Sequence, residues 1–383
     1  MENKENQRFK TLKGFILGVI LSLAVFCLYH LIVAFAVPAD TPSSPASFDK
    51  IKQIENTIDE HYMGEIDKQE MTDVMFLGIV AGLEDRYSTY YTAEEYEDVT
   101  SVQSGYFEGI GIEINRDDET GKLIVVNVYE DAPADRSGML EGDLLITING
   151  TDVTDYTAAE AVELIQADET GTINITVLRD GEMIDLSMKP EKILRNPVKS
   201  EILEGNIGYI KIGTFDNLTA EEFKSELDRC MEAGVKGIII DLRSNLGGLV
   251  SAACDSLREF MPEGLLVYTE NKYGERKEYN CDGENELDIP MAVLVNSKTA
   301  SSAEIFSGAV KDYDRAVIIG TQTFGKGIVQ DSFKLSDGSV VKLTVAHYYT
   351  PDGNDIHGQG ITPDIVVEDE DEQLEKAIEV LSE

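Results

Sequence analysis

A serine and a lysine in the last third of the chain have the types and surroundings of a nucleophile and its base. Ser301 stands in a run of small residues after an apolar stretch that ends at Val295, a pattern typical of a strand-to-helix turn, and Glu304 falls in the first turn of that helix. Lys326 lies between two glycines in the loop TFGKGIVQ, and residues 293–330 contain no histidine. Because a serine hydroxyl needs an adjacent base to become a nucleophile, this stretch predicts a serine served by a lysine.

A lysine can act as a base only as the neutral amine. The free side chain has a pKa of about 10.4, so the protein must bury the amine or place positive charge near it. Phe324, Ile328 and Val329 lie close to Lys326 in the sequence and suit an apolar pocket. Gln330 follows four residues after the lysine, so on a strand both side chains would point to the same face.

The oxyanion of a tetrahedral intermediate needs hydrogen-bond donors, and two backbone N–H groups are candidates. One belongs to Ser302, directly after the expected nucleophile, and the other to Gly247 in the segment DLRSNLGG, where glycine allows close backbone approach. A simple strand-to-helix turn explains Gly247 and Gly248 equally well. In the same segment we expect Asp241 and Arg243 to have structural roles.

The elements that must position these residues alternate in type. Residues 191–370 contain strand-like stretches (GNIGYIKIGTF, VKGIIIDLRSNLGG) and amphipathic or apolar helices (LTAEEFKSELDRCMEAG, LVSAACDSLREFM), which predicts a layered α/β core. Residues 371–383 form an acidic C-terminal helix, and residues 41–100 have mainly helical spacing after a short Pro/Ser linker. The predicted fold class is therefore multidomain α/β. Residues 1–40 are expected to form a cytoplasmic tail and an N-terminal membrane helix.

Residues 101–190 differ from both neighbours, with short strands separated by glycine turns and one helix, TAAEAVELIQ. The ordered segments GYFEGIGIEI, APADRSGMLEGDLLITING and AAEAVELIQ resemble a PDZ domain. The resemblance implies that an extended peptide adds as a strand, with its C-terminal carboxylate on backbone N–H groups. Gly109, Ile110 and Gly111 would form that carboxylate-binding loop, in which glycines let the amides converge on an anion.

The N-terminus predicts a membrane anchor. Lys4, Arg8, Lys10 and Lys13 precede an uncharged stretch, Gly14 to Val37, long enough as a helix to span about 30 Å of hydrocarbon. Basic residues before the stretch place the N-terminus in the cytoplasm and the remainder outside it. A cleaved signal peptide is the alternative, because Ala-Phe-Ala near the end of the stretch resembles a cleavage site.

The acidic composition bears on which partners the protein can bind. The 72 acidic against 32 basic residues disfavour nucleic acid and anionic membrane surfaces, which repel a negative protein. Cys230, Cys254 and Cys281 are expected to be buried free thiols, and no histidine spacing indicates a metal site. We therefore expect neither metal nor cofactor.

The whole order of motifs resembles the C-terminal processing peptidases, PDZ-containing serine peptidases of bacterial envelopes and plastids. The matching segments are GIVAGLEDRYSTYYT, the PDZ region, YIKIGTF, DLRSNLGG, NSKTASSAEIFSGA, GTQTFGKGIVQ and YYTPDGNDIHGQGITPD. The resemblance implies a crotonase/Clp-like core with Ser301 as nucleophile, Lys326 as general base and Gln330 orienting the lysine. Glu304 matches a family glutamate, and capping of the helix explains it equally well.

This chain departs from the family pattern at three places, and two of them leave alternatives open. Lys298 stands where a glycine is usual and could compete as base, although its place before the turn favours solvent. Ser302 replaces a common alanine and could attack instead of Ser301. We prefer Ser301, because Glu304 then follows three residues later and Lys326 falls at the family spacing. Asn354-Asp355 replaces the more usual Arg-Ser.

The sequence thus predicts a membrane-anchored, extracytoplasmic serine endopeptidase that cleaves proteins near their C-terminal tails. The resemblance implies that its PDZ domain binds the substrate C-terminus and presents or gates it for cleavage. The helical N-terminal segment could mediate a homodimer, as in related enzymes. One rival is a catalytically inactive PDZ scaffold, which the retained serine, lysine and glutamine disfavour. The other is an acyl-transfer enzyme of the crotonase type, which the PDZ region and the extracytoplasmic address disfavour.

Overall fold

The chain divides into two compact units, each described here by itself. The computed structural model describes residues 42–117, 121–129, 131–166, 171–194 and 196–382; the units are Met1–Glu84 and Asp85–Glu383. The predicted anchor from Gly14 to Val37 lies outside the described residues. Within the described residues, no helix has the length and apolar character needed to cross a membrane.

The first unit is a pair of helices, α2 (Pro45–His61) and α3 (Lys68–Ala81). Ser44 caps α2 by accepting a hydrogen bond at 3.2 Å from a first-turn N–H, and proline occupies the first helical position. Asp67 caps α3 by accepting bonds of 2.8 and 3.0 Å from the N–H groups two and three residues later. The predicted helical character is confirmed for these residues.

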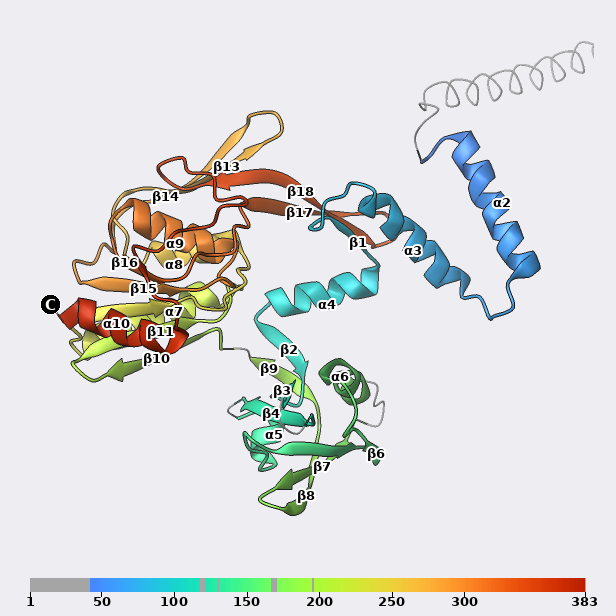
Figure 1. Ribbon diagram of the computed structural model, residues 1–383, viewed down its shortest axis with the longest axis horizontal. Coiled ribbons are helices and arrows are strands. Elements are labelled where there is room, and N and C mark those ends of the chain that lie inside the picture. The colour runs from blue at the N-terminus through green and yellow to red at the C-terminus, as the bar shows by residue number, and fades with distance from the viewer. Residues whose placement is uncertain (1–41, 118–120, 130, 167–170, 195, 383) are drawn as a thin grey trace, which may run out of the picture. The chain divides into compact units, whose positions relative to one another are not determined.

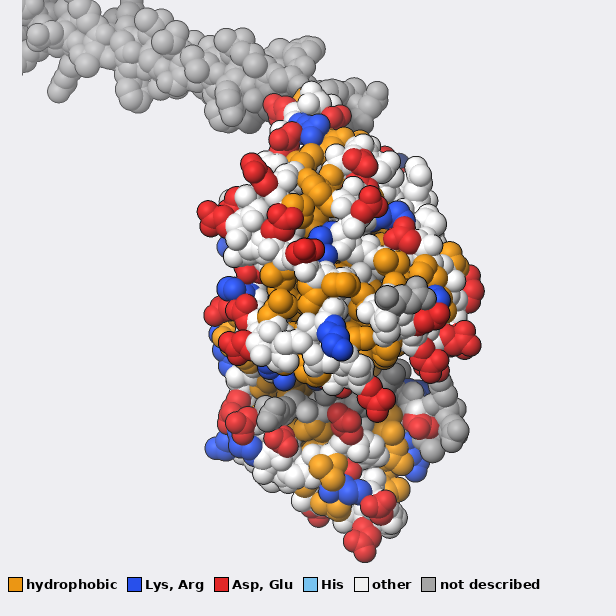
Figure 2. All heavy atoms as spheres, turned by 90° about the vertical axis from the view of Figure 1, so that its left-hand side faces the viewer, with side chains coloured by type: hydrophobic (Ala, Val, Ile, Leu, Met, Phe, Trp, Pro, Cys, Tyr) orange, Lys and Arg blue, Asp and Glu red, His pale blue; other side chains and the backbone are white. Residues whose placement is uncertain are grey.

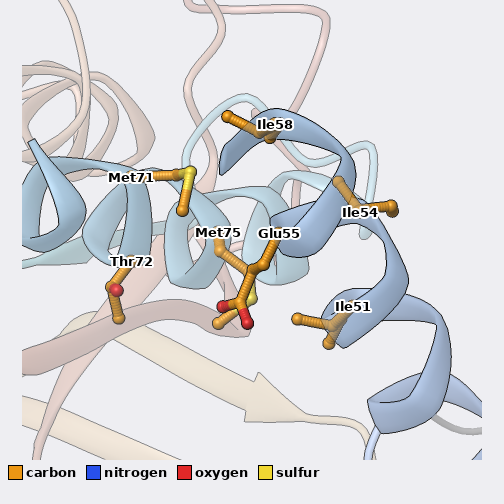
Figure 3. A pocket seen from close by; sticks show the side chains of 7 residues that line it. All are labelled: Ile51, Ile54, Glu55, Ile58, Met71, Thr72 and Met75. Carbon is orange, nitrogen blue, oxygen red and sulfur yellow. The ribbon is translucent and has the colours of Figure 1, made fainter. Parts of the chain in front are cut away.

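An apolar groove lies between α2 and α3, as Figure 3 shows. The side chains that line it are Ile51, Ile54, Glu55, Ile58, Met71, Thr72 and Met75. Further large apolar side chains of this unit are exposed, among them Phe48, Val74, Leu77, Ile79 and Leu83. Contiguous exposed apolar surface commonly marks an interaction site.

In the second unit, the PDZ region follows β1 (Thr89–Tyr91) and α4 (Ala93–Gln103) (Figure 1). Its elements are β2 (Tyr106–Gly109), β3 (Ile112–Arg116), β4 (Leu123–Val128), α5 (Pro133–Arg136), β5 (Leu144–Ile148), β6 (Thr151–Asp152), α6 (Ala158–Gln166), β7 (Ile173–Arg179), β8 (Glu182–Met188) and β9 (Glu191–Leu194). The sheet order is β3-β4-β5-β7-β8, while β2 pairs with β9 and β6 with β5. Alternate residues of these strands fill one core, so the predicted β-domain is confirmed.

The following region is built on a six-stranded sheet in the order β10-β11-β12-β15-β16-β19. The strands are β10 (Val198–Leu203), β11 (Ile207–Ile212), β12 (Gly237–Asp241), β15 (Met291–Val295), β16 (Val317–Gly320) and β19 (Ile365–Val366). All neighbours are parallel except β10 and β11. Parallel strands are buried on both faces, and every residue of β12 and β15 is buried. The predicted layered α/β core is thus present.

Helices cover both faces of this sheet (Figure 1). They are α7 (Thr219–Glu232), α8 (Val250–Leu257), α9 (Ser302–Asp312) and α10 (Glu370–Ser382). Because side chains alternate along a strand, Ile238 and Ile240 pack in the cluster that includes residues of α7, α8 and α9, whereas Ile239 packs with residues of α10. The acidic C-terminal helix is therefore part of the core.

A second sheet contains β1, β13 (Gly264–Asn271), β14 (Arg276–Cys281), β17 (Ile328–Lys334) and β18 (Val340–Tyr349). β1 lies within the segment expected to be helical, and its Thr-Tyr-Tyr sequence has high β propensity. It pairs antiparallel with β18, far away in the sequence. The helical expectation is wrong at these three residues because a distant strand supplies the hydrogen-bond partners.

The acidic excess is a surface property. Figure 2 shows Asp and Glu side chains, in red, scattered over the face in view. Among the described residues, four carboxylates are buried: Asp143, Asp216, Asp241 and Glu304. Arg179 pairs with Asp143 through two bonds of 2.6 Å in the PDZ region, and Arg243 with Asp241 in the core. The cysteines in α7, α8 and β14 are buried free thiols, as predicted.

Candidate active site

Ser301 lies at the turn between β15 and α9, in a backbone conformation that non-glycine residues rarely adopt, with φ 58° and ψ −121°. Such strained residues cluster at functional sites, and a sharp strand-to-helix turn exposes the side chain of a nucleophile. The turn is fixed by Thr299, whose hydroxyl donates to the Leu242 carbonyl at 2.8 Å, and by the Ala300 N–H, which donates to the Asn245 carbonyl at 2.9 Å.

The two neighbouring serines have different environments. Ser301 is partly exposed, whereas Ser302 is 0% exposed and its buried hydroxyl has no hydrogen-bond partner in the structure. A substrate carbonyl cannot reach a fully buried hydroxyl without local unfolding. The geometry therefore favours Ser301 as the nucleophile.

The Glu304 carboxylate joins the serine turn to the lysine loop. Its Oε2 atom accepts hydrogen bonds of 2.8 Å from the N–H groups of both Ser301 and Lys326. Its Oε1 atom accepts bonds of 2.6 Å from the Gly325 N–H and the Thr323 hydroxyl. This carboxylate is fully buried, and its four donors come from segments about twenty residues apart. It is both a helix cap and the connection between the two candidate catalytic residues.

The Lys326 amine donates to Gln330 Oε1 at 3.2 Å, which brings the predicted base and its orienting residue together. The expectation that both side chains share a face of one strand is wrong, because Lys326 precedes β17 and the register shifts between Val329 and Gln330. A glycine loop and a bulge, rather than strand alternation, produce the contact. The Gln330 side-chain amide also donates to the carbonyl of Tyr87.

Burial and nearby cations act on the pKa of the Lys326 amine in one direction, and nearby carboxylates act in the other. Burial lowers the pKa of the Lys326 amine, and the cations of Lys342 and Arg86 lower it further, against Asp85 and Glu304, which raise it. The net direction is downward, which favours the neutral amine that a general base requires.

Two tyrosines complete the site, and neither was predicted from the sequence to lie there. The amine of Lys326 lies 4.9 Å from the centroid of the Tyr87 ring. The Tyr348 hydroxyl donates to the Lys326 carbonyl, and burial raises the pKa of this phenol well above its ordinary value. Ser301 hydrogen-bonds the same phenol and partly offsets that rise. No spacing signal links these tyrosines to the site.

The loop after β12 brings Gly247 against the nucleophile. With φ 100°, this glycine has no room for a side chain, since a Cβ would lie 2.7 Å from the Ala300 oxygen and 2.8 Å from Ser301 Cβ. Its N–H donates to Asn245 Oδ1 at 2.8 Å. The Ser302 N–H is at the first position of α9, where helices lack an internal acceptor. Both predicted oxyanion donors are beside Ser301, and that of Gly247 is engaged by Asn245.

The remaining expected residues fall outside this cluster of contacts. Lys298 is exposed, in agreement with a solvent-facing side chain. Asp241 accepts hydrogen bonds from Tyr209 and Arg243, and the Arg243 guanidinium reaches the Glu370 carbonyl at the start of α10, which is a structural arrangement. Across the described ranges, no group of three or more His, Cys, Asp or Glu residues is arranged to hold a metal ion.

The predicted carboxylate loop links β2 to β3 in the PDZ region. The Ile110 carbonyl accepts from the Ala134 N–H at 2.8 Å, and the Gly111 carbonyl accepts from the Tyr129 N–H at 3.0 Å. Gly111 has φ 83°, and a Cβ there would lie 2.2 Å from that of Ala132. The loop, including Gly109, thus requires glycine at its last position.

Comparison with known proteins identifies the families of the core and of the β-domain. Residues 206–367 match the profile of peptidase family S41, and residues 124–179 match that of a PDZ domain. The chain is 35% identical to the carboxy-terminal processing protease CtpA of Bacillus subtilis, over 84% of this chain and 69% of that protein. The protein belongs to peptidase family S41. As a family S41 member of the carboxy-terminal processing group, it is a serine-type peptidase.

Other S41 peptidases extend the comparison. The carboxyl-terminal-processing protease of Synechocystis is 33% identical, over 76% of this chain and 69% of that protein. The solved structure of a photosystem II D1 C-terminal processing protease has a TM-score of 0.52 at 29% identity, covering 86% of this chain and 90% of that chain. A putative S41 protease from Bacteroides fragilis, at 17% identity and TM-score 0.56, shares the fold.

Proposed function

We propose that this S41 peptidase is an extracytoplasmic endopeptidase in which Ser301 is the nucleophile and Lys326 the general base. The observation that carries the proposal is the single carboxylate oxygen of Glu304 that holds the N–H groups of both residues. Positive φ at Ser301, the lowered pKa of the Lys326 amine and its hydrogen bond to Gln330 support the same assignment.

The reaction follows from these positions. The neutral amine of Lys326 accepts the hydroxyl proton as Ser301 Oγ attacks the scissile carbonyl carbon. The Ser302 N–H stabilises the oxyanion, and the Gly247 N–H joins it by exchanging its bond to Asn245. The Lys326 ammonium then protonates the leaving amine, which leaves an acyl-enzyme. Water, deprotonated by the same amine, releases the acid and restores Ser301.

The decisive test uses the full chain in detergent and an unstructured protein with an apolar C-terminal tail. We expect Ser301→Ala and Lys326→Ala each to lower kcat/KM by about 10⁴-fold or more, and Ser302→Ala to change it by less than about tenfold. Cleavage that survives Ser301→Ala and Lys326→Ala would refute the dyad. Tail binding without cleavage by any form would support the inactive scaffold, the alternative function.

We also propose that the PDZ domain binds the C-terminal tail of the substrate. The glycine-dependent loop at residues 109–111 between two strands supports this, since such domains take peptides by strand addition. Amidation of the substrate C-terminus removes the carboxylate charge, so we expect it to raise KM for the protein tail. An unchanged KM, with binding retained by a chain lacking residues 105–190, would contradict the proposal.

The anchor and the location are proposals supported by the sequence alone. The basic residues before Gly14 and the apolar stretch to Val37 suit a single helix with its N-terminus in the cytoplasm. A bacterial alkaline phosphatase, active only outside the cytoplasm, fused after residue 50 should be active and membrane-bound. Activity in the soluble periplasmic or secreted fraction would indicate cleavage of the segment instead.

We further propose that the first unit pairs with a second copy of the chain through the α2–α3 groove. Ile54 is 50% exposed and Val74 is 58% exposed, which favours burial against a partner surface. Ile54→Glu should lower the molar mass measured by light scattering from dimer to monomer, whereas Thr57→Glu, on a polar position of α2, should not. A monomeric wild-type chain would refute this interface.

A further inference from the structure

A second lysine of the catalytic sheet lacks an acidic partner. Lys342 lies on β18 between β1 and β17, opposite Thr89 and Ser332. Its side chain is partly buried, and burial lowers the pKa of its amine. Within the described residues, no ion pair includes Lys342 or Lys326. Neither Lys326, in the loop before β17, nor Lys342, on β18, is therefore neutralised by an ion pair.

The strand register places Lys342 on the same sheet face as the residue that holds the Lys326 amine. Gln330, which accepts the hydrogen bond from the Lys326 amine, lies opposite Thr344 on β18. Lys342 is two residues before Thr344 and opposite Ser332, in the regular part of the ladder beyond the register shift. Residues two apart on a strand share a face, and diagonal neighbours are within reach of long side chains. Lys342 is thus a diagonal neighbour of the glutamine that holds the base.

The other charges near Lys326 come from several elements. Arg86, whose guanidinium lies 4.6 Å from the Tyr87 ring centroid, is the second cation. Asp85, Glu304 and the Tyr87 ring act in the opposite sense, because each favours an ammonium. Other titratable groups around the loop are the Tyr348 phenol, His357, which packs against Gly327, and His347, whose ring centroid lies 5.3 Å from that of His357. Removing one of the two cations would therefore favour the charged form of Lys326.

We propose that Lys342 is a positioning residue of the peptidase reaction that acts through Lys326. Its ammonium makes an ammonium at Lys326 unfavourable, and so keeps the base amine free to accept the Ser301 proton. After Lys326 has taken that proton, the same repulsion assists its transfer to the leaving amine, while Lys342 neither gains nor loses a proton. This inference rests on the proposed function of Ser301 and Lys326.

Two measurements on the full chain test the inference. The first is the pH dependence of kcat/KM, and the second is the pH dependence of acylation of Lys326 by acetic anhydride, read by mass spectrometry. Only the neutral amine is acylated, so the second profile needs no turnover. We expect Lys342→Met to move the midpoint of both profiles to higher pH by on the order of one unit. At a pH below the midpoint, this shift corresponds to about tenfold lower kcat/KM. Lys342→Arg should retain the wild-type profiles, since it keeps the charge.

Lys334→Met is the matched control, because it removes an equal charge from the exposed end of β17 and should leave both profiles in place. Unmoved profiles in Lys342→Met, or equal shifts in Lys342→Met and Lys342→Arg, would overturn the inference. Failure of both Lys342→Met and Lys342→Gln to fold would also overturn it, because the residue would then be structural. If Lys326 of the wild-type chain is acylated at unusually low pH but the chain cleaves no substrate, the peptidase proposal is refuted and the inference about Lys342 is not.

Discussion

Three of the described helices, α4, α6 and α9, begin with the same Ser/Thr-x-x-Glu pattern, and α6 and α9 differ in their surroundings. α9 in the peptidase core begins after Ser301 with Glu304 three residues later, and α6 in the PDZ domain begins after Thr157 with Glu160 three residues later. In both, the glutamate accepts a hydrogen bond of 2.8 Å from the N–H of the residue before the helix. This bond is one half of a capping box, so the local motif caps α6 and α9 in the same way.

Burial makes the difference between them. Glu160 is exposed and bonds only within its own turn, to Thr157. Glu304 is fully buried and also bonds the loop that carries Lys326. Ser301 has positive φ, whereas Thr157 does not. The comparison teaches that an ordinary helix cap becomes an organiser of the active site when a distant loop packs on it.

The largest expected effect separates the two glutamates directly. Glu304→Gln presents an amide to backbone donors inside the core, so we expect about 2–4 kcal/mol lower stability and about 100-fold lower kcat/KM. Glu160→Gln should leave kcat/KM unchanged and lower Tm only slightly. Chemical denaturation and kinetics on a tail substrate measure both. Equal effects of the two changes would show that Glu304 is a cap and nothing more.

A glycine exchange examines the PDZ side of the comparison. Gly111→Ala forces a Cβ to 2.2 Å from that of Ala132 at φ 83°. We therefore expect about 1–3 kcal/mol of local destabilisation and about tenfold lower kcat/KM for protein tails. Gly138→Ala is the control, with φ 86° and open space. Hydrolysis of a short peptide that does not need the PDZ domain should persist in both variants. Similar loss on tail and peptide would contradict separate roles for the two regions.

Glycine at the two cap positions should have opposite effects on stability. Ser301→Gly relieves the positive φ, so we expect about 1 kcal/mol higher stability together with loss of activity. Thr157→Gly removes a side-chain acceptor at an unstrained position and should lower stability by a few tenths of a kcal/mol. Urea unfolding midpoints give both values. A less stable Ser301→Gly chain would show that the Ser301 conformation stores no strain.

The smallest effect concerns another first-turn glutamate, Glu222 in α7. Burial, aided by Asp216 and nearby glutamates, raises its pKa to about 7. Between the unfolded-state pKa of Glu222 and its higher folded-state pKa, the folded state holds a proton that the unfolded chain has released. The stabilisation that this proton provides is therefore complete in acid and is lost as pH rises through about 7. Glu222→Gln should raise Tm by about 1–2 °C at pH 8 and by nothing at pH 4.

Thermal unfolding at the two pH values checks this last prediction. Glu160 provides the contrast, since the Thr157 N–H lowers its pKa and its contribution is lost as pH falls instead. A Glu222→Gln chain that gains stability equally at both pH values would point to a cause other than charge.

The sequence by itself determined the features that depend on near neighbours. Strand periodicity and glycine turns predicted the small β-domain, the α/β core and the turn at Ser301, because each arises within a few residues, and the resemblance of ordered segments identified the β-domain as a PDZ domain. Tertiary structure decided the features that depend on distant segments. It made β1 a strand by pairing it with β18, and it reached the Lys326–Gln330 contact through a loop and a register shift.

Burial, too, was decided only by the tertiary structure. The sequence left Ser301 and Ser302 as rivals and the role of Glu304 open, and it gave no setting to Tyr87, Tyr348 or Lys342. A cap or hydroxyl has the same local pattern whether it lies in water or in a dry core, and its energetics differ between the two. The packing of the lysine loop on α9 is what turned an ordinary helix start into a candidate active site.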